Sequence, residues 1–185
     1  MLVNKTVSEI LDAFASTDPT PGGGSASALA GAVGASLLLM VAHMQKTRTS
    51  PEADRGALER AASLLEPAAA ELRGLIDRDT AAYDAVVAAY RLPKASDAEK
   101  AARKEAIQKA MREAIEAPLG VMRACRTALA QLPLVEAHGN PNAASDVQVG
   151  RALLSAGLAG ARANVEINLP SIADAEYVAR VREEI

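Results

Sequence analysis

A stretch of about twenty residues without a formal charge, "SASALAGAVGASLLLMVAHM" from Ser25 to Met44, sets the first limit on the fold. A helix that is apolar on every side is either buried in protein or placed in a membrane. The first half of this stretch consists almost entirely of Ala, Gly and Ser, which are only weakly hydrophobic, and no second stretch of this kind accompanies it. We therefore expect a central helix that is buried by other helices, not a membrane span.

The overall composition indicates an all-α protein that forms a single domain over residues 1–185. Hydrophobic residues make up 50% of the chain, yet aromatic residues make up only 2% and Trp is absent, so the core must consist of Ala, Leu, Val and Met. These side chains pack best where helices approach closely, and no segment shows the period of two that is typical of strands. We expect a single bundle of about six helices.

Several classes of function are disfavoured by charge and by reactive residues. The net charge is -3 with both signs interspersed, whereas a nucleic-acid-binding surface needs clustered Lys and Arg. The single Cys125 allows no internal disulfide, and two His residues argue against a dedicated metal site. The N-terminal "MLVNKTVSEILDAF" carries charges where a signal peptide needs an apolar segment, so we expect a cytoplasmic protein without membrane or nucleic-acid partners.

Start and stop signals divide the chain into helices. Thr6 with Glu9, and Ser96 with Glu99, form capping-box patterns that open a short helix and a long one. Ser25 is the expected cap of the uncharged helix. Further helices are expected over about 52–92, about 96–132 and about 144–169, with bends at Pro67 and Pro118, an end at Pro170 and a last short helix from Ser171.

The loop "DPTPGGGS" before the uncharged helix contains more backbone freedom than an ordinary turn requires. It lacks the Lys and Ser/Thr of a P-loop, and no strand precedes it as in a dinucleotide-binding motif. What it offers is a set of backbone N–H groups at a helix start, without side chains in the way. Such groups suit a carboxylate or the polar edge of a ring.

One carboxylate interrupts an apolar stripe on the helix predicted over 52–92. Apolar or aromatic residues recur there at spacings of four and three, and Asp79 takes one position of the stripe, one turn before Tyr83. Asp77 and Asp84 lie off the stripe, where solvent is sufficient explanation. Asp79 is either a buried acid that pairs with an Arg or caps a neighbouring helix, or a group that faces a polar pocket and takes part in chemistry.

A second set of polar residues surrounds the start of the helix predicted over 144–169. The loop residues Asn140, Asn142 and Ser145 are turn and cap formers, or together with Asp146 a polar binding cluster. Asn164 lies on the same helix face as Asp146 and is a further candidate for ligand binding, because a buried amide needs a partner. About five turns, or about 27 Å, separate Asp146 from Asn164, so they cannot serve one small site within one subunit.

Four residues are further candidates for catalysis or binding. Lys46 follows the uncharged helix, where a cation complements the helix dipole and can also meet an anionic substrate tail. Ser25 and His43 with an Asp lack the context of a catalytic triad. His138 lies in a predicted loop and is expected at the surface.

The segments "PTPGGGSASALAGAVGASL", "RDTAAYDAVVAAYRLPKASDAEKAAR", "GNPNAASDVQVG" and "ANVEINL" occur in an order and spacing that resemble the formiminotransferase-cyclodeaminase and methenyltetrahydrofolate cyclohydrolase family. The resemblance covers almost the whole chain. It implies an all-α bundle that assembles as a homodimer and acts on one-carbon derivatives of tetrahydrofolate. By position, it implicates the loop formed by Pro21, Gly22, Gly23, Gly24 and Ser25, then Asp79 with Tyr83, and the segment from Asn140 to Asp146.

The resemblance includes two reactions. A cyclohydrolase opens 5,10-methenyltetrahydrofolate to 10-formyltetrahydrofolate, and a cyclodeaminase closes formiminotetrahydrofolate to the methenyl form with loss of ammonia. The stretch "AYRLPKASDAEKAAR" is more similar to the free-standing cyclohydrolases, and no formiminotransferase domain is present in the sequence, so we favour the hydrolase. A non-catalytic helical interaction module is the alternative from another class, but it gives no reason for the glycine loop.

The favoured reaction suggests roles for the candidate residues. A carboxylate attracts the cationic amidinium and accepts a proton from the attacking water, which suits Asp79 best and Asp146 as the alternative. Tyr83 either donates to the developing alkoxide or fills space. No metal or redox cofactor is expected, because the carbon is already electrophilic.

Overall fold

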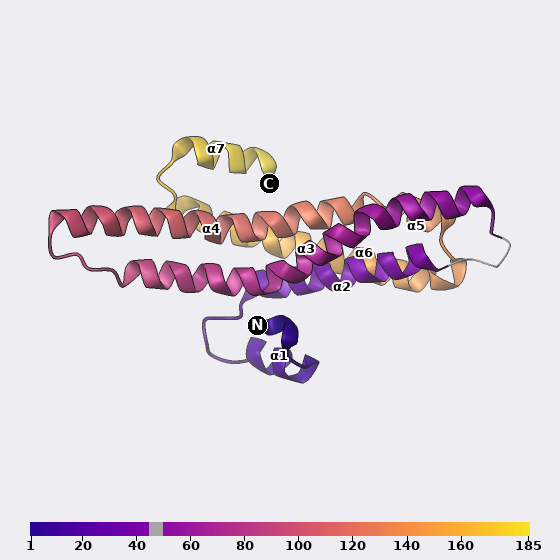
Figure 1. Ribbon diagram of the computed structural model, residues 1–185, viewed down its shortest axis with the longest axis horizontal. Coiled ribbons are helices and arrows are strands. Elements are labelled where there is room, and N and C mark those ends of the chain that lie inside the picture. Colours follow the sequence, from indigo (N-terminus) through magenta and orange to yellow (C-terminus); the bar gives the residue numbers. More distant parts are fainter. Residues whose placement is uncertain (45–49) are drawn as a thin grey trace.

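The computed structural model describes residues 1–44 and 50–185, and within these ranges it contains helices and no strand (Figure 1). The all-α class is therefore confirmed. The α-helices are α1 (Val7–Phe14), α2 (Gly23–His43), α3 (Glu52–Tyr90), α4 (Asp97–Leu129), α5 (Leu132–His138), α6 (Ala144–Asn168) and α7 (Ala175–Glu184), with 3-10 turns η1 (Leu2–Asn4), η2 (Pro141–Ala143) and η3 (Leu169–Ser171).

The local start signals are confirmed by the structure. Thr6 caps α1 and Ser96 caps α4, and in each case the Glu at the third helical position completes a capping box. The predicted limits of α3 and α6 agree with the observed ones to within about two residues. Both α3 and α4 continue as helices through their internal prolines, Pro67 and Pro118.

Three predicted helix ends are wrong. Ser25 does not cap α2, because the helix already begins at Gly23 and Gly22 takes the cap position without a side-chain hydrogen bond. The helix expected over 96–132 ends at Leu129, and α5 starts afresh with Pro in its first turn. Asp174, not Ser171, caps α7 by accepting hydrogen bonds from two backbone N–H groups.

The uncharged helix α2 is the central helix of the bundle and packs against α3, α4 and α6. Glycines allow its backbone to touch that of α6. A Cβ at Gly34 would lie 2.7 Å from the carbonyl oxygen of Gly150, and a Cβ at Gly157 would lie 2.8 Å from that of Ser27. These contacts leave no room for a side chain at either position, so glycine is required at Gly34 and Gly157.

One face of α2 is open in the single chain. Val33 and Met40 are 43% and 41% exposed, and they line a groove of about 670 Å³ between α2, α3 and the N-terminal segment. By length and composition α2 is the one helix in the described residues that could cross a membrane, but half of its most apolar window is buried inside the fold. The expectation of a core helix holds for the faces that meet α3, α4 and α6.

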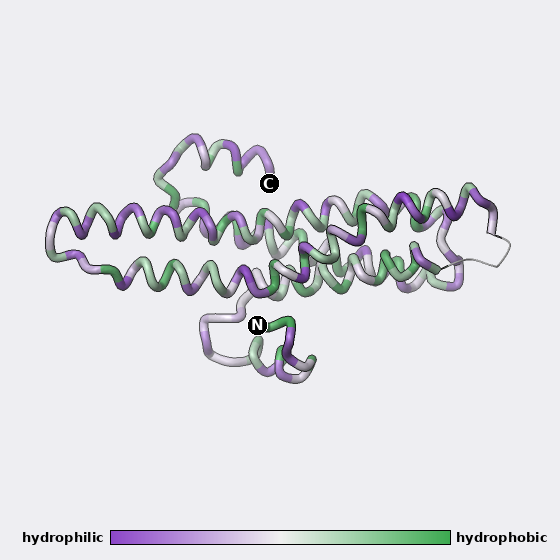
Figure 2. The backbone as a smooth tube through the Cα atoms, viewed as in Figure 1, coloured by the Kyte–Doolittle hydropathy of each residue, from purple (hydrophilic) through white to green (hydrophobic). Residues whose placement is uncertain are grey.

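The ends of α3 and α4 project beyond the other helices and form an arm, defined here as residues 83–107 (Figure 1). Many hydrophilic residues lie along α4 in this arm (Figure 2). The N-terminal α1 and the C-terminal α7 lie on opposite sides of the bundle in the same view. Arg123 holds α7 against α4 through two hydrogen bonds to Glu184.

Candidate functional site

The glycine loop ends at a helix start that has no cap of its own. A cis peptide bond joins Thr20 to Pro21, and Gly22 adopts an extended conformation before α2 begins. Since no side chain of the loop caps the helix, the first N–H groups of α2 need partners from elsewhere in the fold. The partial positive charge of the helix start makes a carboxylate the preferred partner.

Asp79 of α3 is that partner. Its Oδ2 accepts hydrogen bonds from the backbone N–H of Ser25 at 2.9 Å and from the Ser25 hydroxyl at 3.1 Å. The Ser25 hydroxyl also lies 3.3 Å from that of Thr80. Ser25 is fully buried and Asp79 is partly buried, so these hydrogen bonds join α2 to α3 at the edge of the core. Of the alternatives left open for Asp79, the structure shows the contact with the start of a neighbouring helix. The catalytic role favoured from the sequence stays a prediction.

The Asp79 carboxylate also explains one glycine of the loop. A Cβ at Gly24 would lie 2.0 Å from Oδ1 of Asp79 and 2.5 Å from its carboxyl carbon, which no real Cβ does. The carboxylate therefore lies directly over the backbone of Gly24. With Oδ2 bonded to Ser25, Oδ1 is the oxygen left to accept a hydrogen bond from water or a ligand.

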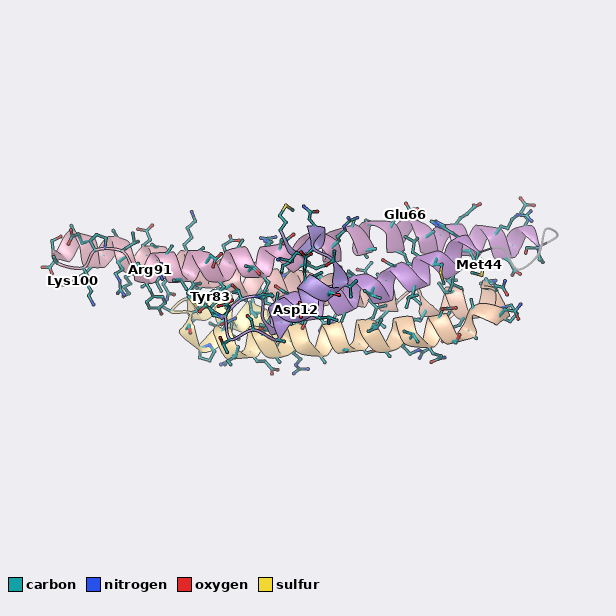
Figure 3. All side chains as sticks on the ribbon, turned by 90° about the horizontal axis from the view of Figure 1, so that it is seen from below. Asp12, Met44, Glu66, Tyr83, Arg91 and Lys100 are labelled. Atoms are coloured by element: carbon teal, nitrogen blue, oxygen red, sulfur yellow. The ribbon has the colours of Figure 1, made fainter. Side chains whose placement is uncertain are left out.

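Asn164 of α6 joins this end of α2. Its Nδ2 donates to the carbonyl oxygen of Gly160 at 2.9 Å and lies 3.4 Å from the position of a Cβ on Gly23. Tyr83 follows Asp79 one turn along α3 and is 40% exposed (Figure 3). The structure thus gathers the glycine loop, Asp79 and Asn164 at one end of the bundle, with Tyr83 beside them on α3. We call this group the glycine-loop site.

The segment from Asn140 to Asp146 lies at the opposite end of α2. A Cβ at the preceding Gly139 would lie 2.9 Å from Val41, close to the helix end, and α2 is about 31 Å long. Asn140 behaves as a cap, since its Oδ1 accepts from the backbone N–H of Asn142 at 3.0 Å. Asn142 and Ser145 are exposed and Asp146 is partly buried. These residues do not meet Asp79 within one chain, as the spacing of Asp146 and Asn164 predicted.

Lys46 lies outside the described residues.

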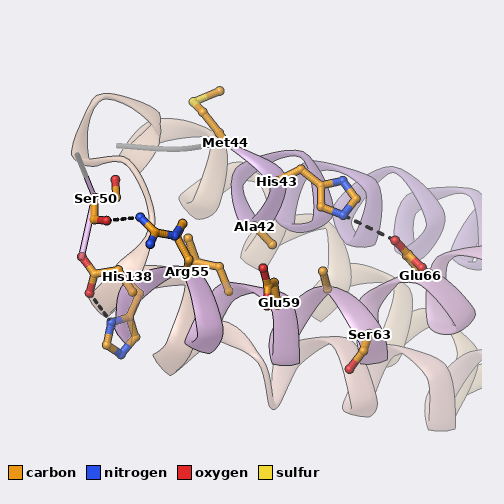
Figure 4. A pocket seen from close by; sticks show the side chains of 12 residues that line it. Ala42, His43, Met44, Ser50, Arg55, Glu59, Ser63, Glu66 and His138 are labelled. Carbon is orange, nitrogen blue, oxygen red and sulfur yellow. Dashed lines mark hydrogen bonds and ion pairs between the residues drawn. The ribbon is translucent and has the colours of Figure 1, made fainter. Parts of the chain in front are cut away.

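A pocket that the sequence did not predict lies at the end of α2 opposite the glycine-loop site. Its volume is about 390 Å³, and both histidines of the chain line it (Figure 4). His138 Nδ1 lies 2.8 Å from Asp54 Oδ1, and His43 Nε2 lies 3.4 Å from Glu66 Oε1. His138 is therefore half-buried in an ion-pair geometry, and the expectation of a surface residue is wrong. No spacing signal joins His138 to Asp54, because they are far apart in the chain.

Two other reactive groups have structural explanations. Asp77 was expected to need only solvent, but its Oδ1 accepts a hydrogen bond from the backbone N–H of Leu2, and its buried Oδ2 has no partner among the described residues. Burial raises the pKa of the Cys125 thiol to about 12, so it is protonated at neutral pH and unsuited to nucleophilic attack. Within the described ranges, no cluster of three or more His, Cys, Asp or Glu side chains could hold a metal ion.

Comparison with known proteins identifies the family. The sequence profile of the formiminotransferase-cyclodeaminase family matches residues 6–185. The chain belongs to this family. It is 40% identical to a methenyltetrahydrofolate cyclohydrolase of Methylorubrum extorquens over 181 residues, which cover 96% of this chain and 85% of that protein.

Two further similar proteins carry the name of a cyclodeaminase. It is 32% identical to the formimidoyltransferase-cyclodeaminase of Sus scrofa over 184 residues, and spans all of its own length but only 34% of that larger protein. Among solved structures, a formiminotetrahydrofolate cyclodeaminase from Thermotoga maritima superimposes with a TM-score of 0.85 at 29% identity, covering 100% of this chain and 88% of that one. The fold and the family are thereby established together.

Proposed function

We propose that this protein hydrolyses 5,10-methenyltetrahydrofolate to 10-formyltetrahydrofolate. The observation that carries the proposal is the 40% identity to a cyclohydrolase that matches the chain over most of both lengths. The bifunctional relatives are about three times longer, so the chain corresponds to only a part of them. No finding favours a non-catalytic interaction module.

The chemistry assigned to the glycine-loop site follows from the position of Asp79. Water attacks the carbon that bridges N5 and N10, and Oδ1 of Asp79 accepts one proton as the C–O bond forms. The bond from that carbon to N5 then breaks, N5 takes up a proton, and the formyl group stays on N10. One proton is released overall, which balances the charge of the cationic substrate. The same carboxylate stabilises the amidinium before the attack.

The other candidate residues have supporting roles in this proposal. The free N–H groups at the start of α2 and the Asn164 amide contact polar atoms of the folate ring system. The Tyr83 hydroxyl donates to the alkoxide that forms on the bridging carbon. We expect no cofactor, because the bridging carbon of the substrate is already cationic and needs neither a Lewis acid nor a redox centre. A cytoplasmic location is part of this proposal, since such a reaction uses the intracellular folate pool.

The purified protein should remove the methenyl absorbance faster than spontaneous hydrolysis does, and should release no ammonia from 5-formiminotetrahydrofolate. The cyclodeaminase remains the competing function, because the similar solved structure carries that name. Both substrates are therefore assayed on one preparation. Ammonia release without methenyl hydrolysis would assign the chain to the cyclodeaminases instead.

We further propose that the protein is a homodimer that pairs through the open face of α2. The groove of about 670 Å³ along this face is lined mainly by apolar side chains, and Leu11 on the neighbouring α1 is 62% exposed. Exposed apolar surface of this kind marks an interaction site. An uncharged helix suits a two-fold interface, because each copy meets the same surface without like-charge repulsion. An antiparallel pairing of the two α2 helices would also bring the segment from Asn140 to Asp146 of one copy toward the glycine loop of the other.

Light scattering should give the mass of two 19.1 kDa chains, and Val33→Glu should give that of one. The substitution places an unpaired charge in the apolar interface, which is strongly unfavourable. Leu64→Glu is the matched control, since Leu64 on α3 is similarly exposed at 47% but lies outside the groove. A dimer that persists in Val33→Glu would remove α2 from the interface.

A further inference from the structure

The arm continues the stripe of α3 on which Asp79 lies. Tyr83 and Tyr90 follow at helical spacing on the same stripe and are 40% and 52% exposed. Tyr90 lies about 16 Å beyond Asp79 along the helix axis. The stripe thus carries, in order along α3, the carboxylate of the glycine-loop site and two accessible aromatic rings.

A pocket lined by four cationic side chains adjoins the far end of this stripe. It has a volume of about 320 Å³ and is lined by Lys94, Lys100, Arg103, Lys104, Ile107 and Gln108. We call it the basic pocket. The arm carries five basic and four acidic side chains, and four of the five basic ones line the basic pocket, whereas the whole chain has a net charge of -3. The positive charge is therefore concentrated at the basic pocket.

The cation nearest the stripe is held in a fixed position. Arg103 donates to the carbonyl oxygen of Tyr90 from Nε at 3.3 Å and from Nη2 at 3.0 Å, and its guanidinium lies 5.5 Å from the centre of the Tyr90 ring. Three anchoring contacts to one residue keep the charge beside the ring. Arg103 thereby connects the aromatic stripe to the basic pocket.

The acids of the arm leave part of this positive charge uncompensated. Glu99 is engaged at the start of α4, where hydrogen bonds from the backbone N–H groups of Ser96 and Ala95 lower its pKa. Asp97 pairs with Lys100 at 2.9 Å. Among the described residues, the structure shows no ion pair for Lys94 or Lys104. These two ammonium groups are the ones available to an anionic ligand.

We propose that the basic pocket binds the glutamate tail of the folate substrate. The inference rests on the proposed function. It is supported by the order of chemical groups along the ligand, which matches the order of side chains along α3. A methenyltetrahydrofolate carries a cationic ring system, then an aminobenzoyl ring, then a glutamate with free carboxylates. The stripe presents a carboxylate, then the rings of Tyr83 and Tyr90, then the lysines of the basic pocket. Each group of the ligand meets its chemical complement in the same sequence along α3.

The size and surroundings of the basic pocket favour a short carboxylate chain over a nucleic acid. A polynucleotide requires a continuous basic surface with many phosphate contacts. Here the cations gather at one end of a narrow arm, with Asp97, Glu99 and Glu105 between them. A tail with two or more carboxylates can engage both available ammonium groups.

The test compares substrates with one and with three γ-linked glutamates. For the unmodified protein, KM should be lower for the triglutamyl substrate, and the difference should shrink as salt rises. Lys104→Glu should raise KM for the triglutamyl substrate by roughly tenfold, because an attractive contact becomes a repulsive one. The advantage of the longer tail should then be lost in KM more than in kcat.

Lys109→Glu is the matched control. Lys109 is an exposed cation of α4 outside the basic pocket, about 140° around the helix from Lys104, and its replacement changes the net charge by the same amount. This variant should keep the KM ratio of the unmodified protein. Equal losses in the two variants would mean that overall charge, not the basic pocket, attracts the tail.

The outcomes separate the two proposals. Absence of hydrolysis with either substrate contradicts the proposed function. Hydrolysis of both substrates with equal KM contradicts the basic pocket alone. Binding of a single-stranded oligonucleotide that Lys104→Glu abolishes, without any dependence of KM on tail length, would reassign the pocket to nucleic acid.

Discussion

Asp79→Asn is expected to lower kcat for methenyltetrahydrofolate hydrolysis by about a hundred- to ten-thousandfold. The amide cannot accept the proton of the attacking water and carries no charge to stabilise the amidinium. Its remaining carbonyl oxygen still accepts from the backbone N–H of Ser25, so the hydrogen bond between α2 and α3 persists. The measurement is the decay of the methenyl absorbance after subtraction of the spontaneous rate, together with a thermal unfolding curve.

Asp84→Asn is the matched control for this experiment. Asp84 lies on the same helix, is exposed and points away from the stripe that carries Asp79. Its removal should leave kcat within experimental error. A full loss of activity in Asp146→Asn, with Asp79→Asn active, would make Asp146 the catalytic base and contradict the role of Asp79.

Gly157→Ala is expected to lower the free energy of unfolding by about 1–3 kcal/mol. The added methyl would meet backbone atoms only, with the Ser27 carbonyl oxygen at 2.8 Å and the Gly31 nitrogen at 3.0 Å. Neither atom can rotate away as a side chain does, so α2 and α6 must separate. Urea denaturation at a fixed protein concentration measures the change.

Gly74→Ala is expected to raise the free energy of unfolding, in contrast to Gly157→Ala. Gly74 lies within α3 and a Cβ there would meet nothing within 4 Å. Alanine should stabilise the helix by about 0.5–1 kcal/mol through its higher helix propensity. Comparison of the two variants therefore separates the effect of backbone contact at Gly157 from the effect of helix propensity. Destabilisation in both variants would contradict the proposed role of close backbone packing.

Local signals made much of the fold predictable. The capping boxes at Thr6 and Ser96 each lie within four residues, so the sequence alone contains both partners. The start of α5 is also readable, because Pro133 is a residue typical of a first helical turn. It was not predicted, because only a loop was expected between the helices over about 96–132 and 144–169.

The candidate site was predictable only in part, because its contacts join distant segments. The stripe on α3 singled out Asp79, but nothing in the spacing showed that Ser25 would be its partner. Asp77 appeared unremarkable for the same reason, since Leu2 reaches it only after the N-terminal segment folds onto α3. The pairing of His138 with Asp54 is equally remote in sequence. The family, in contrast, was predictable from four short segments of the sequence, and comparison over the whole chain confirms it.

The backbone contacts between α2 and α6 have a consequence for affinity. Gly34 meets Gly150, and Gly157 meets the segment of α2 from Ser27 to Gly31. Two interlocked helices of this kind resist sliding and rolling, so the N–H groups at the start of α2 keep their direction before any substrate arrives. When the substrate binds, the protein then loses little conformational entropy, and more of the interaction energy contributes to affinity.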